Sequence, residues 1–146
     1  MSATEVAALL GGRPVLKREI TSELDLAELV RAGLPASALD HMLDQLAEVV
    51  GSQAAIYQVV GSVRTLQRKR AAHSTLSTEE SDRLARLARV LAQAEQSLGS
   101  QEKARRWLVK PNRALSGRTP LSLVDSDAGT LAVVRELGRI EHGVYS

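Results

Sequence analysis

The chain contains no cysteine and no phenylalanine, and its 146 residues include one tryptophan and two tyrosines. Without cysteine, it can form neither a disulfide bond nor a thiolate metal site. With so few aromatic residues, the apolar core must be built from Leu, Ala and Val. Leu and Ala have high helix propensity because they lose little side-chain freedom in a helix. The composition therefore predicts an all-α protein.

The sequence also lacks any run of about 18 to 20 apolar residues, the length that a membrane span requires. Residues 1–5 have neither the basic flank nor the long apolar stretch of a signal peptide. We therefore expect a cytoplasmic protein that does not contact a membrane. The net charge of +2 is too small to make the whole surface attract nucleic acid, so the position of the basic residues matters more than their number.

Residues with catalytic or metal-binding chemistry are few and scattered. None of the three histidines, His41, His73 and His142, has a second histidine or a cysteine at ligand spacing. Asp40 and Asp44 lie one helical turn apart beside His41, a pattern typical of a solvated face. No glycine-rich phosphate loop follows a strand, and no serine lies in a nucleophile motif. We therefore expect no enzymatic activity, no cofactor and no metal.

Helical spacing of apolar residues recurs along the chain and is interrupted by glycine and proline. The i, i+3, i+4, i+7 pattern is clearest over residues 39–50 and 84–98. Ser77 and Glu80 have the spacing of a capping box before the second of these segments. Residues 13–20 are expected to form an extended connector. The pattern predicts an N-terminal helical segment (1–34), a helical domain (35–98) and a second helical domain (99–146).

The last predicted helix has two sequence signals. Asp125 is expected to be its N-cap, because aspartate accepts hydrogen bonds from the first backbone amides of a helix. Its core-facing residues are expected to be Leu131, Val134, Leu137 and Ile140. Thr119-Pro120 predicts a short preceding helix, since proline is favoured at the first helical position.

Two short predicted helices, 52–60 and 63–72, meet at Gly61 in the manner of a helix-turn-helix unit. In such units the second helix enters the major groove of DNA. At about 100° per residue, Val63 and Leu66 share an inner side, whereas Arg64 and Arg68 face outward. The stretch between Gly61 and His73 contains four basic residues and no acidic one. The second helix is therefore a candidate DNA-recognition helix.

The side-chain types suggest how this helix would contact DNA, because arginine pairs with both acceptors of guanine and threonine contacts a thymine methyl group. The residues expected to approach base edges are Arg64, Thr65, Gln67 and Arg68. Those expected to contact phosphates, where binding is salt-dependent and blind to sequence, are Ser62, Lys69 and Arg70. The alternative interpretation is a solvated basic helix, and Gly61 lies closer to Thr65 than in the usual pattern.

The most distinctive stretch is 111–121, which reads PNRALSGRTPL. Together with Gly129 and the ending RIEHGVYS (139–146), it resembles the toxin-binding domain of Xre-type antitoxins, which are encoded beside RES-domain toxins. Ser116 stands where a glycine is expected in that family. Residues 35–98 are similar to the helix-turn-helix domain of the same antitoxins, so the resemblance covers most of the chain.

The resemblance implies a function. Similar antitoxins form homodimers, bind an operator DNA ahead of their own genes as repressors, and bind the toxin with the C-terminal domain. RES toxins resemble ADP-ribosyltransferases and consume NAD, and the end of the antitoxin closes the entrance to the NAD site. The residues that the resemblance assigns to toxin binding are Arg139, Glu141, His142, Gly143, Val144, Tyr145 and Ser146.

Two other functions fit the sequence. The chain could be a plain helix-turn-helix transcription regulator whose C-terminal domain only mediates dimerisation. It could also be a protein-binding module whose basic helix never contacts DNA. Under either alternative, Tyr145 folds back on the last helix and Gly143 is simply its C-terminal cap.

Overall fold

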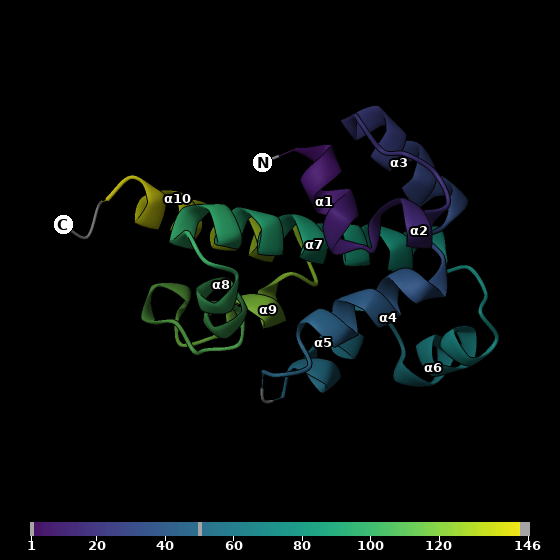
Figure 1. The fold of residues 1–146 in the computed structure, drawn as a ribbon. Coiled ribbons are helices and arrows are strands. Elements are labelled where there is room, and N and C mark those ends of the chain that lie inside the picture. Colours follow the sequence, from purple (N-terminus) through teal and green to yellow (C-terminus); the bar gives the residue numbers. More distant parts are fainter. Residues whose placement is uncertain (1, 50, 144–146) are drawn as a thin grey trace.

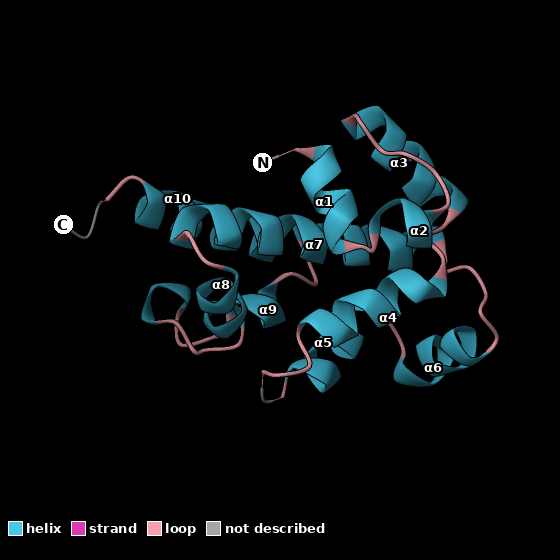
Figure 2. Ribbon diagram, in the orientation of Figure 1, coloured by secondary structure: helices cyan, strands magenta, loops and turns pink. Residues whose placement is uncertain are grey.

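The structure, a computed structural model, describes residues 2–49 and 51–143. Within these ranges the secondary structure is helical, apart from loops and two isolated β-bridges (Figure 2). The prediction of an all-α protein is confirmed. The helices, in chain order, are α1 (Ala3–Leu9), α2 (Gly12–Leu16), α3 (Glu23–Ala32), α4 (Ala36–Gln45), α5 (Ser52–Val60), α6 (Val63–Ala71), α7 (Thr78–Leu98), α8 (Gln101–Leu108), the 3-10 helix η1 (Arg113–Leu115), α9 (Pro120–Leu123) and α10 (Asp127–Glu141).

Helix α7 is the centre of the fold, because α1, α3, α5, α8 and α10 all pack against it (Figure 1). The predicted capping box is present at its start: the Ser77 hydroxyl accepts from the Glu80 amide at 3.0 Å, and the Glu80 carboxylate accepts from the Ser77 amide at 2.8 Å. Its end is fixed by Gly99, whose φ of 72° is the left-handed conformation that glycine adopts without strain.

The core consists mainly of leucine, alanine and valine, as the composition predicts. Leu84, Leu87 and Leu91 of α7 are fully buried, and so are Leu39 and Met42 of α4. The single tryptophan, Trp107, packs half-buried against the same core. Among the described residues, no helix is long and apolar enough to cross a membrane.

The prediction of an extended connector over residues 13–20 is wrong in its first half, since α2 occupies Gly12–Leu16. Pro14 lies in the first turn of α2, where a missing amide proton removes no helical hydrogen bond. A helix of five residues is too short to show apolar periodicity.

Helix α4 also ends earlier than expected, at Gln45, and Val49 lies in a bend after it.

Two details of the last helix are also wrong. Its N-cap is Ser126, whose hydroxyl accepts from the Gly129 amide at 3.0 Å, in place of the expected Asp125. Leu131, expected in the core, is 48% exposed, whereas Val133 is fully buried. Of the other expected core residues, Leu137 is fully buried and Val134 and Ile140 are half-buried, so the inner face of α10 is shifted toward Val133.

Gly129 allows α10 to begin in close contact with α9. A Cβ atom at this position would lie 2.0 Å from the carbonyl oxygen of Leu123 and 3.0 Å from the Ser126 hydroxyl. By contrast, a Cβ atom at Gly138, further along α10, would meet no atom within 4 Å. Steric exclusion thus explains the glycine at position 129.

Candidate functional site

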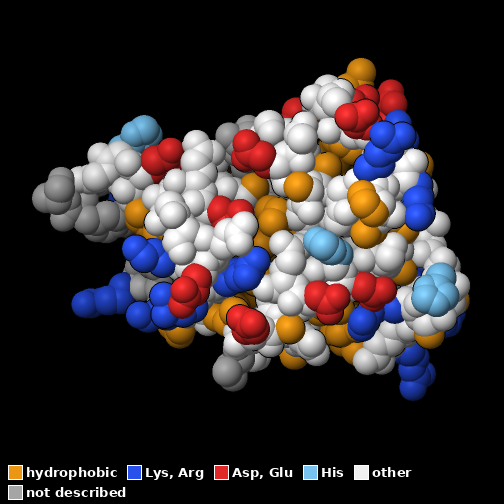
Figure 3. All heavy atoms as spheres, viewed as in Figure 1, with side chains coloured by type: hydrophobic (Ala, Val, Ile, Leu, Met, Phe, Trp, Pro, Cys, Tyr) orange, Lys and Arg blue, Asp and Glu red, His pale blue; other side chains and the backbone are white. Residues whose placement is uncertain are grey.

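Helix α6 lies at one edge of the molecule, far from the end of α10, and presents its N-terminal half to solvent (Figure 1). Lys and Arg side chains reach this edge at the lower right of Figure 3. Four of the candidate DNA-contacting residues are exposed, and Thr65 is half-buried. The exposed four are Ser62, Arg64, Gln67 and Arg68.

Only one of the two expected apolar anchors of α6 is buried. Leu66 is completely buried, whereas Val63 is 44% exposed, so the expectation that Val63 packs inward is wrong. The inward face continues from Leu66 to the half-buried Lys69 and Arg70 in the last turn. The inner face of α6 is therefore formed by Leu66 together with Lys69 and Arg70, and Val63 is not part of it.

Lys69 points toward the start of α7. Its Nζ atom lies 2.6 Å from Oε1 of Glu80, and the exposed fractions of the two side chains are 20% and 11%. Burial acts to raise the pKa of the Glu80 carboxyl, but hydrogen bonds from Lys69 and Ser77 and the charge of Lys69 outweigh it, so that this pKa is lower than its ordinary value. The same carboxylate thus caps α7 and holds α6.

Arg70 connects α6 to the two preceding helices. Its Nε donates to the Asp40 carboxylate of α4 and its Nη1 donates to the Tyr57 hydroxyl of α5. The guanidinium carbon also lies 5.9 Å from the centre of the Tyr57 ring, within cation–π range. The stretch between Gly61 and His73 contains no acid, but Asp40 and Glu80 from outside it bind Arg70 and Lys69 and fix the orientation of α6.

The turn between α5 and α6 consists of Gly61 and Ser62. The Gly61 amide donates to the Tyr57 carbonyl at 2.9 Å, and this bond closes the end of α5. A Cβ atom at Gly61 would lie 3.4 Å from the side chain of Glu80, so the turn passes close to the carboxylate that binds Lys69. The helix-turn-helix geometry is therefore packed directly on the start of α7.

At the other end of the molecule, the predicted toxin-contacting residues lie in the last turn of α10. The Nη1 atom of Arg139 lies 3.0 Å from Oε2 of the buried Glu136, although the Arg139 side chain is 52% exposed. The Glu141 carboxylate accepts from the Gln93 amide at 3.3 Å and from the Ser97 hydroxyl at 3.2 Å, which fixes it against α7.

The remaining predicted toxin-contacting residues follow the helix. His142 is the exposed C-cap of α10, and Gly143 has a φ of 68°, the left-handed conformation expected of a terminal glycine. Val144, Tyr145 and Ser146 lie outside the described residues. Helix α10 ends at the opposite side of the molecule from α6 (Figure 1).

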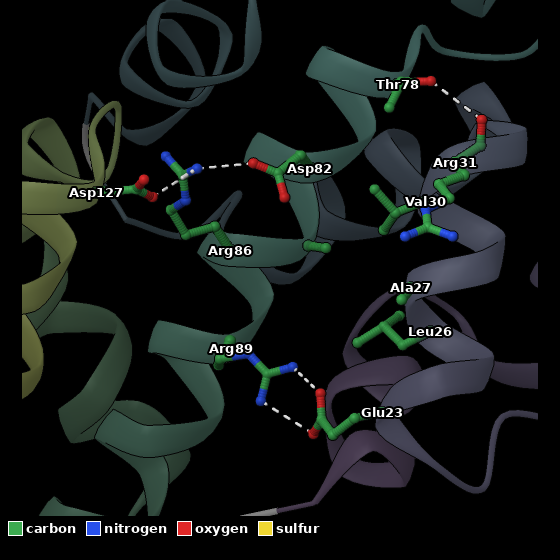
Figure 4. Close-up of a pocket in the computed structure, with 11 residues that line it drawn as sticks. Glu23, Leu26, Ala27, Val30, Arg31, Thr78, Asp82, Arg86, Arg89 and Asp127 are labelled. Atoms are coloured by element: carbon green, nitrogen blue, oxygen red, sulfur yellow. Dashed lines mark hydrogen bonds and ion pairs between the residues drawn. The ribbon is translucent and has the colours of Figure 1, made fainter.

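A cleft of about 570 Å³ lies between α3, α7 and the start of α10 (Figure 4). Two of its arginines are paired with acids: Arg86 lies 2.7 Å from Asp82 and 3.0 Å from Asp127, and Arg89 binds Glu23 of α3. These ion pairs connect α3 and α10 to α7. The described residues contain no cluster of three or more His, Cys, Asp or Glu side chains arranged for metal binding.

Comparison with known proteins identifies both halves of the chain. The family model described as the antitoxin Xre-like helix-turn-helix domain matches residues 25–89, and the one described as the antitoxin Xre/MbcA/ParS C-terminal toxin-binding domain matches residues 93–143. The chain is 32% identical to an antitoxin Xre of Photorhabdus laumondii over 83% of its own length and 81% of that protein. The chain belongs to the Xre antitoxin family.

Two further relatives support this assignment. An antitoxin Xre of Yersinia enterocolitica is 39% identical over 57% of each chain. A protein of Sphingobium named "Prs ADP-ribosylating antitoxin" is 27% identical over 86% of this chain and 83% of its own length. This Xre-family antitoxin has a helix-turn-helix domain that includes α6, followed by a toxin-binding domain that includes α8 to α10.

The position of Glu80 yields a pH prediction. Its folded-state pKa is lowered, so its ion pair stabilises the fold above the ordinary glutamate pKa of about 4.3 and is lost as the pH falls through the lowered value. At neutral pH, E80Q should lower the free energy of unfolding in urea by about 1–3 kcal/mol. Near pH 3, below the ordinary pKa, the difference from the unsubstituted protein should shrink.

The matched control is E79Q. Glu79 lies in the same first turn of α7, but its side chain is exposed and forms no ion pair with any described residue. E79Q should change stability little at either pH. An E80Q effect that is the same at both pH values would contradict an ionic role for Glu80.

Proposed function

We propose that this antitoxin neutralises a RES-domain, NAD-consuming toxin with its C-terminal end and represses its own operon through α6. The observation that carries the proposal is the separation of two surfaces. The exposed polar half of α6 lies at one edge of the molecule, and the end of α10 lies at the opposite side (Figure 1). One chain can therefore present a DNA-binding and a toxin-binding surface without overlap.

The DNA-binding half of the proposal rests on how α6 is held. Leu66, Lys69 and Arg70 fix the helix from inside through burial and ion pairs, so the exposed side chains are presented on a rigid support. Arg64, Gln67 and Arg68 are suited to base edges, with the half-buried Thr65 beside them. Ser62 at the N-cap is suited to a phosphate, because helix N-termini favour anions.

Lys69 and Arg70 were predicted to contact phosphates. Both side chains keep some exposure, 20% and 35%, and retain donors that their acidic partners do not occupy. We assign them first a positioning role, because each is bound to an acid of another helix. Any phosphate contact would be made in addition to that role.

The toxin-binding half rests on the last residues. The Sphingobium relative's name connects it with ADP-ribosylation, which fits a toxin that uses NAD. An NAD site offers donors to a pyrophosphate and apolar surfaces to rings, and Glu141 and Tyr145 supply an acid and a ring. Arg139 and His142 are exposed at the end of α10, and in the sequence Gly143 and Val144 lead to Tyr145 and Ser146. Together these residues form the proposed plug.

We also propose a homodimer, since a twofold protein reads a palindromic operator with two copies of its recognition helix. The proposed division of the chain is an N-terminal helical segment (1–34), the helix-turn-helix domain (35–98) and the toxin-binding domain (99–146). The protein is proposed to act by binding alone, with no catalytic residue of its own.

Substitution of Arg68 tests the DNA-binding half. R68A should weaken binding to a duplex from the promoter region of the antitoxin gene by about 10- to 100-fold, because a base-contacting arginine contributes about 1–3 kcal/mol. The measurement is fluorescence anisotropy over a series of salt concentrations. The control is R31A, which removes an exposed arginine from α3, away from α6. Equal, small effects of the two variants would favour a basic helix that does not contact DNA.

Truncation tests the toxin-binding half. Deletion of residues 143–146 should leave a folded protein with unchanged DNA affinity, since the helices end before Gly143. The truncated antitoxin should fail to protect cells that express the RES-domain toxin, and should leave NAD consumption by the purified toxin uninhibited. Full protection by the truncated protein would contradict the plug.

A further inference from the structure

Positive charge is concentrated in a second segment of the chain, outside α6. Residues 101–124, which form α8, η1 and α9, contain six basic residues and one acidic residue, a net charge of +5. The whole chain has a net charge of +2, so the other residues together carry −3. Lys and Arg side chains gather over α8 and the loop that follows it, at the lower left of Figure 3.

Most of these cations are exposed and unpaired. We call four of them the α8–η1 basic patch: Lys103, Lys110, Arg113 and Arg118. All four are exposed, and none forms an ion pair with any described residue. The one acid of the segment, on α8, pairs instead with Arg106 at 3.6 Å. The charge of the patch is therefore not neutralised by the described part of the chain.

The loop that carries two members of the patch is closed by hydrogen bonds of Asn112. The Asn112 amide donates to the Arg118 carbonyl at 3.0 Å, and the Asn112 carbonyl accepts from the Gly117 amide at 2.9 Å. Its side-chain oxygen accepts from the Ala114 amide at 2.9 Å. The backbone around Arg113 and Arg118 is thus ordered in advance, which reduces the entropy lost when these side chains bind a partner.

Helix α6 by itself offers few cations to the phosphates of DNA. About half to two-thirds of the hydrogen bonds in protein–DNA complexes go to phosphate and sugar. Two of the four cations of α6, Lys69 and Arg70, are bound to acids of other helices. The other two, Arg64 and Arg68, are the ones suited to base edges. Further phosphate contacts must therefore come from another part of the surface.

The α8–η1 basic patch is placed to supply them. Figure 1 shows α6, α5 and the segment from α8 to α9 along one side of α7, and α1 to α3 along the other. Helix α5 lies between the two basic segments, because it packs against both α6 and α9. It contains no charged residue, so no acid on α5 would repel a phosphate backbone that crosses it.

We infer that the α8–η1 basic patch binds the phosphate backbone of the operator DNA beside the site occupied by α6. This inference rests on the proposed DNA binding through α6 and extends the DNA-contacting surface into residues 101–124. Contacts of this kind depend on salt and do not read the base sequence. The segment from α8 to η1 would then strengthen DNA binding, and α6 would select the site.

A protein partner fits the patch less well. Protein interfaces are anchored by buried apolar and aromatic side chains, and lysine is depleted from them. The large hydrophobic side chains exposed among the described residues are Leu24, Val63 and Leu131, none of which belongs to residues 101–124. Trp107 is half-buried against the core. Cations without apolar anchors are typical of protein–DNA interfaces, which are polar and strongly positive.

The test measures binding of the full-length protein to the promoter-region duplex by fluorescence anisotropy, over about 50 to 200 mM salt. K110Q/R113Q/R118Q should weaken binding about 10-fold or more at the middle of this range. The slope of log affinity against log salt should become shallower by about 2–3, because each phosphate contact contributes about 0.9. A duplex of scrambled sequence should lose affinity by the same factor, since phosphate contacts are blind to sequence.

The matched control is R13Q/K17Q/R31Q, which removes the same charge from exposed side chains on the α2 and α3 side of α7 (Figure 1). Its effect on affinity and slope should be small, because charges more than about 10 Å from the duplex are screened at these salt concentrations. Circular dichroism and sedimentation analysis verify that both variants keep the fold and the oligomeric state of the unsubstituted protein.

The outcomes separate this inference from the proposed function. If the unsubstituted antitoxin does not bind the duplex, the proposed DNA binding fails, and the inference fails with it. If R68A loses affinity but K110Q/R113Q/R118Q behaves like the control, only the inference is overturned. A loss of toxin affinity with unchanged duplex affinity would assign the patch to a protein partner, and a loss of dimers would assign it to a second copy; either result overturns the inference.

Discussion

The packing of helices from both ends of the chain around α7 holds the structure together. Ten of its 21 residues are buried, and its neighbours range from α1 at the beginning of the chain to α10 at the end. The match to the helix-turn-helix family model ends at residue 89 and the match to the toxin-binding model begins at residue 93, so the two matched segments meet inside this one helix. A continuous buried helix leaves no flexible linker between them.

Polar contacts at the two ends of α7 orient the two functional helices. Near its start, Glu80 binds Lys69 and thereby holds α6. Near its end, Gln93 and Ser97 bind Glu141 and hold the last turn of α10. Between them, Arg86 joins the beginning of α10 to the same helix. Through α7, α6 and the last turn of α10 are kept at a fixed separation.

Local sequence signals predicted much of the fold, because capping and helix termination depend on neighbouring residues. The capping box at Ser77, the terminal glycine at position 99 and the Thr119-Pro120 start of α9 are all present in the structure. Signals that depend on packing were less informative. Apolar residues on α10 form two overlapping stripes, and spacing alone could not show that Val133 is buried and Leu131 exposed. Similarly, α2 is too short to have a periodicity.

For the candidate site, sequence located α6 and the C-terminal residues but not their partners. Asp40 and Glu80 are 30 and 11 residues away from the basic residues that they bind, so no local pattern reveals the pairs. The ion pairs distinguish positioning cations, Lys69 and Arg70, from the exposed Arg64 and Arg68. The sequence cannot distinguish Lys69 and Arg70 from Arg64 and Arg68, because all four are basic residues on the same helix. Only the folded structure shows which of them are bound to acids.

We propose that DNA and toxin occupy separate surfaces held apart by α7. Hydrogen–deuterium exchange of the full-length antitoxin, alone and with either the promoter duplex or the RES-domain toxin, tests this separation. We expect the duplex to slow exchange in α6 and its preceding turn, and the toxin to slow exchange from α10 to the C-terminus. Protection of the same segment by both partners, or no protection of the C-terminal residues by the toxin, would contradict the account.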